Sequence, residues 1–236
     1  MKILTWNCKL GFSKKKAEYI KSKIADLYVI QECQQQDLIE LDFIFKNKSF
    51  YCDIIESNFG VGLFSDTLNF EILPEYNPCF RYIIPYRVFN DKTQFILFAV
   101  WTKDKDISNA KIEYTQQTWK AICFSKYQKY LQDSVILIGD FNSTNKQKQQ
   151  PHNSQIFAKL KEYGIESAYH KIHACSDYDE EAPTLLWQMK KEQKFHCDYC
   201  FVSSDYKINS VNIGSVDEWE KMKFSDHLPV IVDLVM

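Results

Sequence analysis

The stretch from Val135 to Ser143, with the sequence VILIGDFNS, constrains the fold more than any other part of this chain. Four consecutive apolar residues, three of them β-branched, predict a short strand that is buried on both faces. Gly139 interrupts this run and allows the backbone to turn tightly. Asp140 and Asn142 follow two residues apart, so in an extended segment their side chains point to the same side.

An acid and an amide at the end of a buried strand fit chemistry at a phosphorus atom. The carboxylate of Asp140 can take a proton from water or bind a cation, and the amide of Asn142 can donate to a phosphate oxygen. The alternative is a strand that ends in an ordinary turn, because Gly, Asp, Asn and Ser are all turn formers. The stretch alone leaves both interpretations open, and other parts of the chain decide between them.

Length and composition point to an ordinary globular protein. The chain has 236 residues, of which 45% are hydrophobic, which is enough for one large domain with a full core. No signal peptide, membrane-spanning run, linker or repeat interrupts it, so we expect one soluble, unsecreted, cytoplasmic domain over residues 1–236. A monomer without membrane contacts is the expected state.

The charge balance argues against a globally basic nucleic-acid-binding surface, and the cysteine pattern argues against a disulfide framework or a cysteine metal site. A net charge of −2 gives no global basic field for nucleic acid, and Arg81 and Arg87 are the only arginines. Phosphate recognition must therefore depend on lysines, backbone groups or a metal ion. The eight cysteines are scattered, which indicates reduced thiols. Cys197 and Cys200 have metal-type spacing, but both lie within an expected strand, where offset-three positions face opposite ways, so we interpret them as structural.

The order of apolar patterns predicts an α/β (α+β) protein with two sheets packed together and helices outside. Helices are expected over 14–25, 35–46, 112–131 and from Asn153 or Ser154 to Tyr163. Pro85, inside the expected strand 80–89, predicts an edge strand or a bulge. The other expected strands are 2–8, 27–30, 50–55, 61–65, 68–73, 94–102, 135–138, 184–188, 195–202, 207–213 and 229–235.

Several polar residues stand inside or beside the apolar runs, where a polar side chain is costly unless it is paired or coordinated. Ligands gather at strand ends, so one common site is the simplest explanation. Glu32 suits a hard divalent cation such as Mg²⁺, although a pairing with a lysine is the ordinary alternative. His227 could donate to a phosphoryl oxygen, with Asp198 fixing its tautomer. The full set is Asn7, Glu32, Asp140, Asn142, Asp198, Asp226 and His227.

Six short motifs occur along the chain: ILTWN (3–7), VIQE (29–32), GVGLFS (60–65), GDFN (139–142), DY (198–199) and SDHLP (225–229). They resemble, in the same order, motifs of the endonuclease/exonuclease/phosphatase superfamily, which includes DNase I, exonuclease III-type abasic-site endonucleases and several phosphomonoesterases. The similarity runs from residue 3 to about 235. It implies a DNase I-like four-layer αββα sandwich with two mostly antiparallel sheets, and phosphoester hydrolysis that depends on Mg²⁺ or Mn²⁺.

The resemblance also implies a role for each matched residue. Glu32 would bind the metal, Asn7 would orient the carboxylates of the metal site, and Asp226 would support that site. Asp140 would activate or position the attacking water, and Asn142 would contact the phosphate. His227, held by Asp198, would stabilise charge on the phosphoryl group.

One position departs from the family pattern. Similar proteins generally place a His or Tyr near Trp101, where it touches phosphate or assists the leaving group. An indole donates one hydrogen bond but cannot shuttle a proton. Tyr114 is a possible substitute, with core packing as its expected role.

The substrate prediction favours nucleic acid, and DNA in particular. Lys9 is expected near the site. The stretch Pro183-Thr184-Leu185-Leu186-Trp187 and Phe195 resemble the places where abasic-site enzymes form an apolar sugar pocket, with Leu186, Trp187 and Phe195 as the expected contacts. An ordinary core strand explains the same apolar residues. The acidic stretch 177–181 argues against strong DNA binding. Alternatives are therefore a phosphomonoesterase for a nucleotide or an inositol phosphate, and an inactive binding module on the same scaffold.

Overall fold

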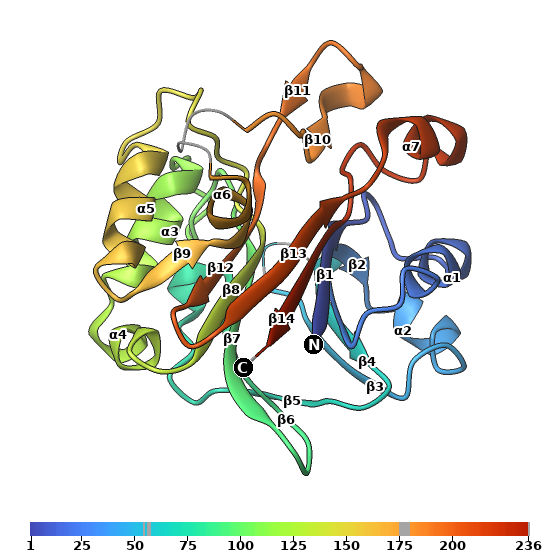
Figure 1. The fold of residues 1–236 in the computed structure, drawn as a ribbon, viewed down its shortest axis with the longest axis horizontal. Coiled ribbons are helices and arrows are strands. Elements are labelled where there is room, and N and C mark those ends of the chain that lie inside the picture. Colours follow the sequence, from blue (N-terminus) through green and yellow to red (C-terminus); the bar gives the residue numbers. More distant parts are fainter. Residues whose placement is uncertain (54, 56–57, 175–179, 236) are drawn as a thin grey trace.

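Two six-stranded sheets pack face to face in the computed structural model, which describes residues 1–53, 55, 58–174 and 180–235 (Figure 1). The first sheet has the order β13 (Lys207–Ile213), β14 (Val230–Val235), β1 (Lys2–Asn7), β2 (Leu27–Gln34), β4 (Phe59–Ser65) and β3 (Asn47–Tyr51). The second has the order β5 (Asn69–Ile72), β6 (Tyr82–Phe89), β7 (Gln94–Trp101), β8 (Val135–Asp140), β12 (Asp198–Ser203) and β9 (Ile165–Ser167). Strands β10 (Leu185–Leu186) and β11 (Lys194–Phe195) form a small separate hairpin.

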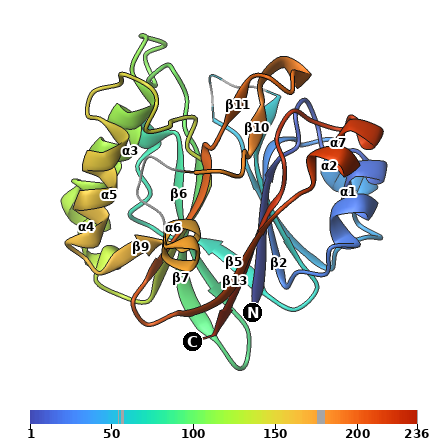
Figure 2. The ribbon, with the colours of Figure 1, turned by 45° about the horizontal axis from the view of Figure 1, so that its top comes forward.

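Helices cover the outer faces of both sheets, so the expected four-layer sandwich is confirmed (Figure 2). One side carries α1 (Lys14–Lys21), α2 (Asp37–Glu40) and α7 (Val216–Met222). The other side carries α3 (Tyr114–Ile122), α4 (Ser125–Leu131) and α5 (Asn153–Lys161). Helix α6 (Ala168–His173) contacts both β12 and β13, where the sheets meet. None of the helices in the described residues has both the length and the apolar character needed to cross a membrane.

Three apolar clusters stabilise these layers. The inner faces of the two sheets bury the first, which includes Val29, Tyr82 and Val232. The second lies between the second sheet and helices α3 to α5, and the third lies between the first sheet and helices α1, α2 and α7. Because strands β1, β2, β7 and β8 are covered on both faces, their sequences are nearly continuous apolar runs, as expected for such strands.

Three expected helices are shorter in the structure. The helix expected over 14–25 ends at Lys21. The 112–131 pattern is interrupted at Phe124, whose extended backbone (φ −74°, ψ 122°) separates α3 from α4. The 35–46 pattern contains only the four residues of α2. The turns after α2 still bury Leu41 and Phe45, and this four-residue spacing is what resembled a longer helix.

The prediction that Pro85 marks an edge strand or a bulge was wrong, because β6 lies between β5 and β7 in a continuous register. Pairing with β5 ends at Ile72 opposite Tyr86. Beyond it the carbonyl of Pro85 accepts from the N–H of Leu73 at 2.9 Å. The missing N–H of the proline therefore falls where the ladder stops, so an interior strand tolerates it.

Position 139 requires a glycine because the backbone there lies too close to strand β7 for a side chain. Its substitution is expected to destabilise the fold strongly. Its φ is +147°, and a Cβ there would lie 1.9 Å from the carbonyl oxygen of Val100. Gly139→Ala is therefore expected to reduce the free energy of unfolding by about 3 kcal/mol or more, measured by urea denaturation. Gly164→Ala is the matched control, because Gly164 also has a positive φ (+72°) but a Cβ there would come no closer than 3.5 Å to Ser204. Equal losses in the two variants would contradict this explanation.

Candidate active site

Polar side chains at the ends of five strands meet at one edge of the paired sheets. The parallel pairs β1–β2 and β7–β8 place the carboxyl ends of four strands at this edge. Strand β12 starts there, with Asp198 directly opposite Asp140 on β8. The loop before β14 brings His227 to the same place. The structure thus brings together the residues named by sequence analysis: Asn7, Glu32, Asp140, Asn142, Asp198, Asp226 and His227.

The imidazole of His227 lies between two buried carboxylates. Its Nδ1 is 2.9 Å from Oδ2 of Asp198, and its Nε2 is 4.0 Å from Oδ2 of Asp140. The backbone around it is fixed as well, since Trp6 donates its indole N–H to the His227 carbonyl at 2.9 Å. Ser225 accepts from the His227 N–H at 3.0 Å and donates to the Asn7 carbonyl at 2.7 Å. Contacts from β1 and β12 therefore hold His227 in one orientation.

The pKa values of His227 and Asp140 are both raised in this arrangement. Burial alone would lower the pKa of His227, but the Asp198 and Asp140 carboxylates outweigh burial and raise the pKa to about 10. Burial raises the pKa of Asp140 to about 7; Asp198 adds to the rise, while His227 and the donors on Asn7 and Asn142 partly offset it. Near neutral pH the site therefore combines a charged imidazolium with a carboxyl that can accept and release a proton.

Asn7 connects this pair to Glu32. Its Nδ2 donates to Oε1 of Glu32 and to Oδ2 of Asp140, each at 3.0 Å. The second oxygen of Glu32 accepts from the N–H of Leu10 at 3.0 Å. A half-buried carboxylate beside an amide oxygen in an open cleft offers the hard oxygen ligands that Mg²⁺ or Mn²⁺ prefers, so the residues present fit such an ion.

Several residues around the site have a positive φ, a strained conformation that side chains rarely adopt. The values are 51° for Lys9, 58° for Leu10, 61° for Glu32 and 48° for Asn142. Glu32 lies at a register shift between Gln31 and Cys33, and such a bulge redirects a side chain away from the regular alternation. The carbonyls of Cys8, Lys9 and Gly11 all accept from Nζ of Lys16, which holds the strained loop in place.

The positive φ of Asn142 corrects the reasoning that placed it beside Asp140. The segment is not extended there, so the two side chains do not meet by simple alternation. A turn brings them together instead: the N–H of Asn142 donates to Oδ1 of Asp140 at 2.8 Å, and its Nδ2 donates to Oδ2 at 3.0 Å. The same Nδ2 also donates to the carbonyl of Thr102 at 3.0 Å.

Asp226 and Lys9 form an ion pair, with Nζ of Lys9 2.7 Å from Oδ2 of Asp226. Both line the same cleft as Glu32 and His227. The lysine thus contacts the carboxylate for which sequence analysis expected a metal-supporting role.

Two adjoining cavities open beside these residues. One, of about 320 Å³, is polar and is lined by Asn7, Glu32, Asn142, Asp226 and His227 together with Trp101. The other, of about 330 Å³, has an apolar wall formed by Leu185, Trp187 and Phe195. Tyr114, Asn142, Leu185 and Trp187 line both.

The structure changes the assignment of two residues near these cavities. Tyr114 was expected to pack in the core, but it lies between the two cavities. Burial raises its pKa to about 12, with Asp104 and Asp140 adding to the rise. Leu186 was expected to form the apolar pocket, but it is buried in the core beside Trp6. The preceding residue, Leu185, lines the cavities instead, because successive strand residues face opposite ways.

Sequence analysis did not identify two residues that contribute to the site. The hydroxyl of Thr184 accepts from the N–H groups of Cys197 and Asp198 at 3.0 and 3.1 Å, which positions the start of β12. Cys197 precedes β12 rather than lying inside a longer strand, and its thiol donates to Oδ2 of Asp198 at 3.6 Å. The CxxC spacing was the signal for Cys197, whereas Cys200 is packed between the sheets. Cys8, Cys33, Cys79, Cys123, Cys197 and Cys200 have free thiols, as expected, and Cys175 lies outside the described residues.

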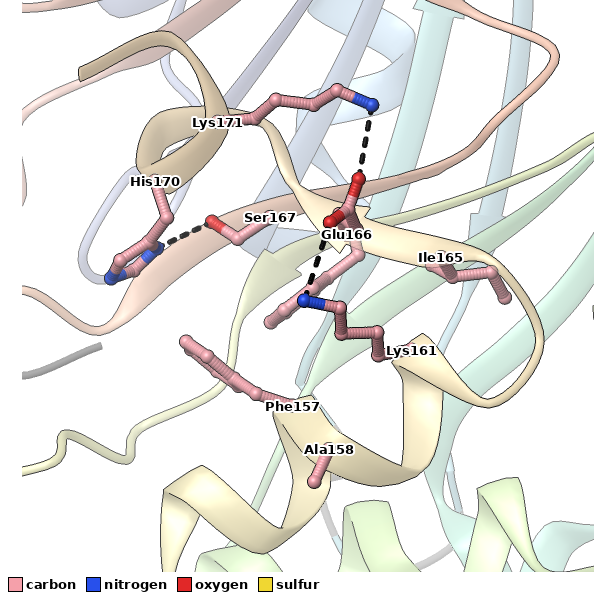
Figure 3. Close-up of a pocket in the computed structure, with 9 residues that line it drawn as sticks. Phe157, Ala158, Lys161, Ile165, Glu166, Ser167, His170 and Lys171 are labelled. Atoms are coloured by element: carbon pink, nitrogen blue, oxygen red, sulfur yellow. Dashed lines mark hydrogen bonds and ion pairs between the residues drawn. The ribbon is translucent and has the colours of Figure 1, made fainter. Parts of the chain in front are cut away.

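A third cavity, of about 330 Å³, lies between α5, β9 and α6 (Figure 3). Its charged side chains pair with one another, with Nζ of Lys161 3.8 Å and Nζ of Lys171 3.0 Å from the carboxylate of Glu166. Nδ1 of His170 is 2.8 Å from the hydroxyl of Ser167. This cavity offers no array comparable to the one around Asp140. Residues 177–179 of the acidic stretch lie outside the described residues.

No protein-family profile and no curated protein sequence matches the chain. Solved structures do match it. An AP endonuclease from Archaeoglobus fulgidus has a TM-score of 0.67 at 16% identity, with 100% of each chain covered. An endonuclease/exonuclease/phosphatase from Beutenbergia cavernae has a TM-score of 0.68 at 14% identity, covering 100% of this chain and 71% of that one. The 3′ phosphatase NExo from Neisseria, bound to a product DNA hairpin, has a TM-score of 0.60 at 14% identity, with 100% of each chain covered. The chain therefore has the DNase I-like fold of the endonuclease/exonuclease/phosphatase proteins.

Proposed function

We propose that this chain is a divalent-metal-dependent phosphodiesterase of that superfamily and that its substrate is DNA. The observation that carries the proposal is one continuous array: Asp198 holds His227, His227 faces Asp140, and Asn7 joins Asp140 to Glu32. Each of these residue types has a role in phosphoryl transfer. Asn7, Glu32 and His227 line one open cleft, and Asp140 and Asp198 are buried directly behind them. An inactive binding module would have no need for two opposed carboxylates buried against an imidazole.

Asp140 is placed to accept a proton from the attacking water. Its carboxylate is fully buried and receives hydrogen bonds from Asn7 and Asn142, so its orientation is fixed before substrate binds. The imidazolium of His227, held by Asp198, donates a hydrogen bond to a phosphoryl oxygen as negative charge grows there. Such preorganised donors contribute about 3 to 4 kcal/mol each to stabilisation of the transition state.

Glu32 would hold the divalent ion, with Asn7 orienting the carboxylate and Asp226 supporting the site. When bound, the ion would supply charge neutralisation at the phosphate. Tyr114 is the candidate donor to the leaving group, because its phenol keeps its proton at neutral pH and faces both cavities. Trp101 is packed against Tyr82, with ring centroids 4.8 Å apart, and contributes a wall of the cleft.

The apolar cavity favours a nucleotide unit over a bare phosphate as the substrate. Trp187 is 49% exposed at the boundary of both cavities, where it could stack on a base or cover a deoxyribose. Lys9 lines the polar cavity, where its ammonium is paired with Asp226 and could also contact a phosphate. The nucleic-acid substrates named for the structural relatives support the same choice. A phosphomonoesterase that acts on a small molecule is the second candidate, because the pair of cavities would also accommodate one nucleotide.

A substrate panel tests the proposal. Plasmid, single-stranded DNA, RNA, abasic duplex and small phosphoesters are incubated with the protein and Mg²⁺, with and without a chelator. Chelator-sensitive cleavage of a DNA substrate is expected. Hydrolysis of nucleotides or inositol phosphates with all nucleic acids left intact would favour the phosphomonoesterase, and no turnover of any substrate would favour the binding module.

Glu32→Gln is expected to raise the Mg²⁺ concentration needed for half-maximal activity by about tenfold or more, because one anionic oxygen ligand is lost. A Mg²⁺ titration of the hydrolysis rate measures this change. Glu40→Gln, at the exposed end of α2, is the control and should leave the titration unchanged. A titration of Glu32→Gln that overlays the wild type would remove Glu32 from the metal site.

A further inference from the structure

The most compact group of metal-type ligands among the described residues does not include Glu32. It consists of Asp140, Cys197, Asp198 and His227, whose ligand atoms all lie within 4.8 Å of one another. All four residues are buried. Cys197 distinguishes this group from the Mg²⁺ position, because it adds a sulfur to two carboxylates and an imidazole.

The thiol is well placed to become a ligand. The Sγ of Cys197 is 3.6 Å from Oδ2 of Asp198, and Cys197, although buried, is one of the residues that line the apolar cavity. The preceding hairpin holds it there, since the hydroxyl of Thr184 accepts from the Cys197 N–H at 3.0 Å. Cys200, three residues further along the same segment, is packed between the sheets.

A second observation points independently to a bound cation. The Oδ1 atom of Asp198 is buried and has no hydrogen-bond partner among the described residues. Asp198 itself is 1% exposed. A buried carboxylate oxygen without a partner is costly, and a coordinated cation would satisfy it.

The chemistry of these four donors selects the type of ion. Mg²⁺ takes oxygen ligands in near-octahedral geometry and keeps several waters, so a cluster containing a thiol is unsuitable for it. Zn²⁺ is bound tetrahedrally by combinations of Cys, His and carboxylate, and four buried side chains complete such a site without water. The sulfur must lose its proton for this, and Zn²⁺ binding drives that loss.

We propose that Asp140, Cys197, Asp198 and His227 form a Zn²⁺ site separate from the Glu32 position, and that Zn²⁺ bound there inhibits the enzyme. The binding stands on the geometry alone. The inhibition rests on the proposed function, because Asp140 would then be a metal ligand and could not accept the proton of the attacking water.

Cobalt substitution tests the binding without any activity measurement. Co²⁺ is titrated into the chelator-treated full chain, and the near-ultraviolet band that arises from a thiolate–Co²⁺ bond is recorded. We expect one equivalent of Co²⁺ to give this band, Zn²⁺ to abolish it, and Cys197→Ala to lack it. Cys200→Ala is the matched control and should keep the band, and near-ultraviolet circular dichroism checks that both variants are folded.

Two outcomes would overturn the site: an unchanged band in Cys197→Ala, or no band in the folded wild-type chain. Asp198→Asn provides a second variant that keeps the thiol and should weaken Co²⁺ binding by about tenfold or more.

Inhibition is tested separately by a Zn²⁺ titration at fixed Mg²⁺, with each variant compared with its own rate in the absence of Zn²⁺. The Zn²⁺ concentration that halves the rate is expected to rise by about tenfold or more in Cys197→Ala. A cobalt band at Cys197 together with unaltered inhibition would keep the site but refute its regulatory effect. Absence of any hydrolysis would refute the proposed function and leave the spectroscopic result standing.

Discussion

Asp140→Asn is expected to lower kcat for DNA cleavage by about a thousandfold, because in the proposed mechanism Asp140 accepts the proton of the attacking water. The substitution also disturbs the array around it. One oxygen of Asp140 accepts from both Asn7 and Asn142, so an amide nitrogen in its place would oppose two donors. The measurement is Mg²⁺-dependent plasmid nicking under single-turnover conditions.

Asp133→Asn is the matched control for this experiment, since Asp133 is exposed and lies just before β8. It should retain the wild-type rate. Near-ultraviolet circular dichroism of Asp140→Asn shows whether the aromatic packing survives. A folded Asp140→Asn protein with a rate within about tenfold of the wild type would exclude Asp140 as the general base.

The free energy of unfolding is expected to fall as the pH rises from about 7 toward 10. The two carboxylates raise the pKa of His227 from its ordinary value of 6.5 to about 10 despite burial, which alone would lower it. In this window the folded chain keeps a proton that the unfolded chain has released. The stabilisation is therefore complete below pH 6.5 and is lost as the pH approaches 10. One such proton gives a slope of up to about 1.4 kcal/mol per pH unit.

Urea denaturation at several pH values, with chelator present, measures this slope. Other groups also titrate at high pH, so the informative quantity is the difference between the wild type and His227→Gln, which should lose the contribution. His173→Gln changes an exposed imidazole and should follow the wild type. If the curves of His227→Gln and the wild type ran parallel across this window, the buried imidazolium would not stabilise the fold.

The sequence could predict the strands that build the site because burial on both faces leaves a clear pattern. Continuous apolar runs located β1, β2 and β8, and a polar residue at the end of such a run needs a partner, which made Asn7, Glu32 and Asp140 informative. Asp140 and Asp198 lie on separate strands, and the sequence does not indicate how far apart they are. Only the register of β12 against β8 places Asp198 opposite Asp140.

Local geometry explains where the sequence was insufficient. The positive φ of Glu32 and Asn142 depends on a bulge and a turn stabilised by tertiary hydrogen bonds, which no residue pattern specifies. Leu185 and Leu186 are the same residue type, so the sequence does not show which of them faces the cavity. The orientation of the hairpin decides this: Leu185 lines the cavity and Leu186 is buried in the core. For Cys197, the expected strand began too early, and this concealed its position beside Asp198 at the wall of the apolar cavity.

The placement of β14 between β13 and β1 makes the candidate site depend on one long-range strand pairing. In that pairing Lys2 lies opposite Asp233 and Thr5 lies opposite Val230. Asn7 ends β1 and His227 precedes β14, so these two residues approach each other only when the pairing has formed. Because pairing between distant segments is slow, we expect local pairs such as β6–β7 to form before the two sides of the cleft are joined.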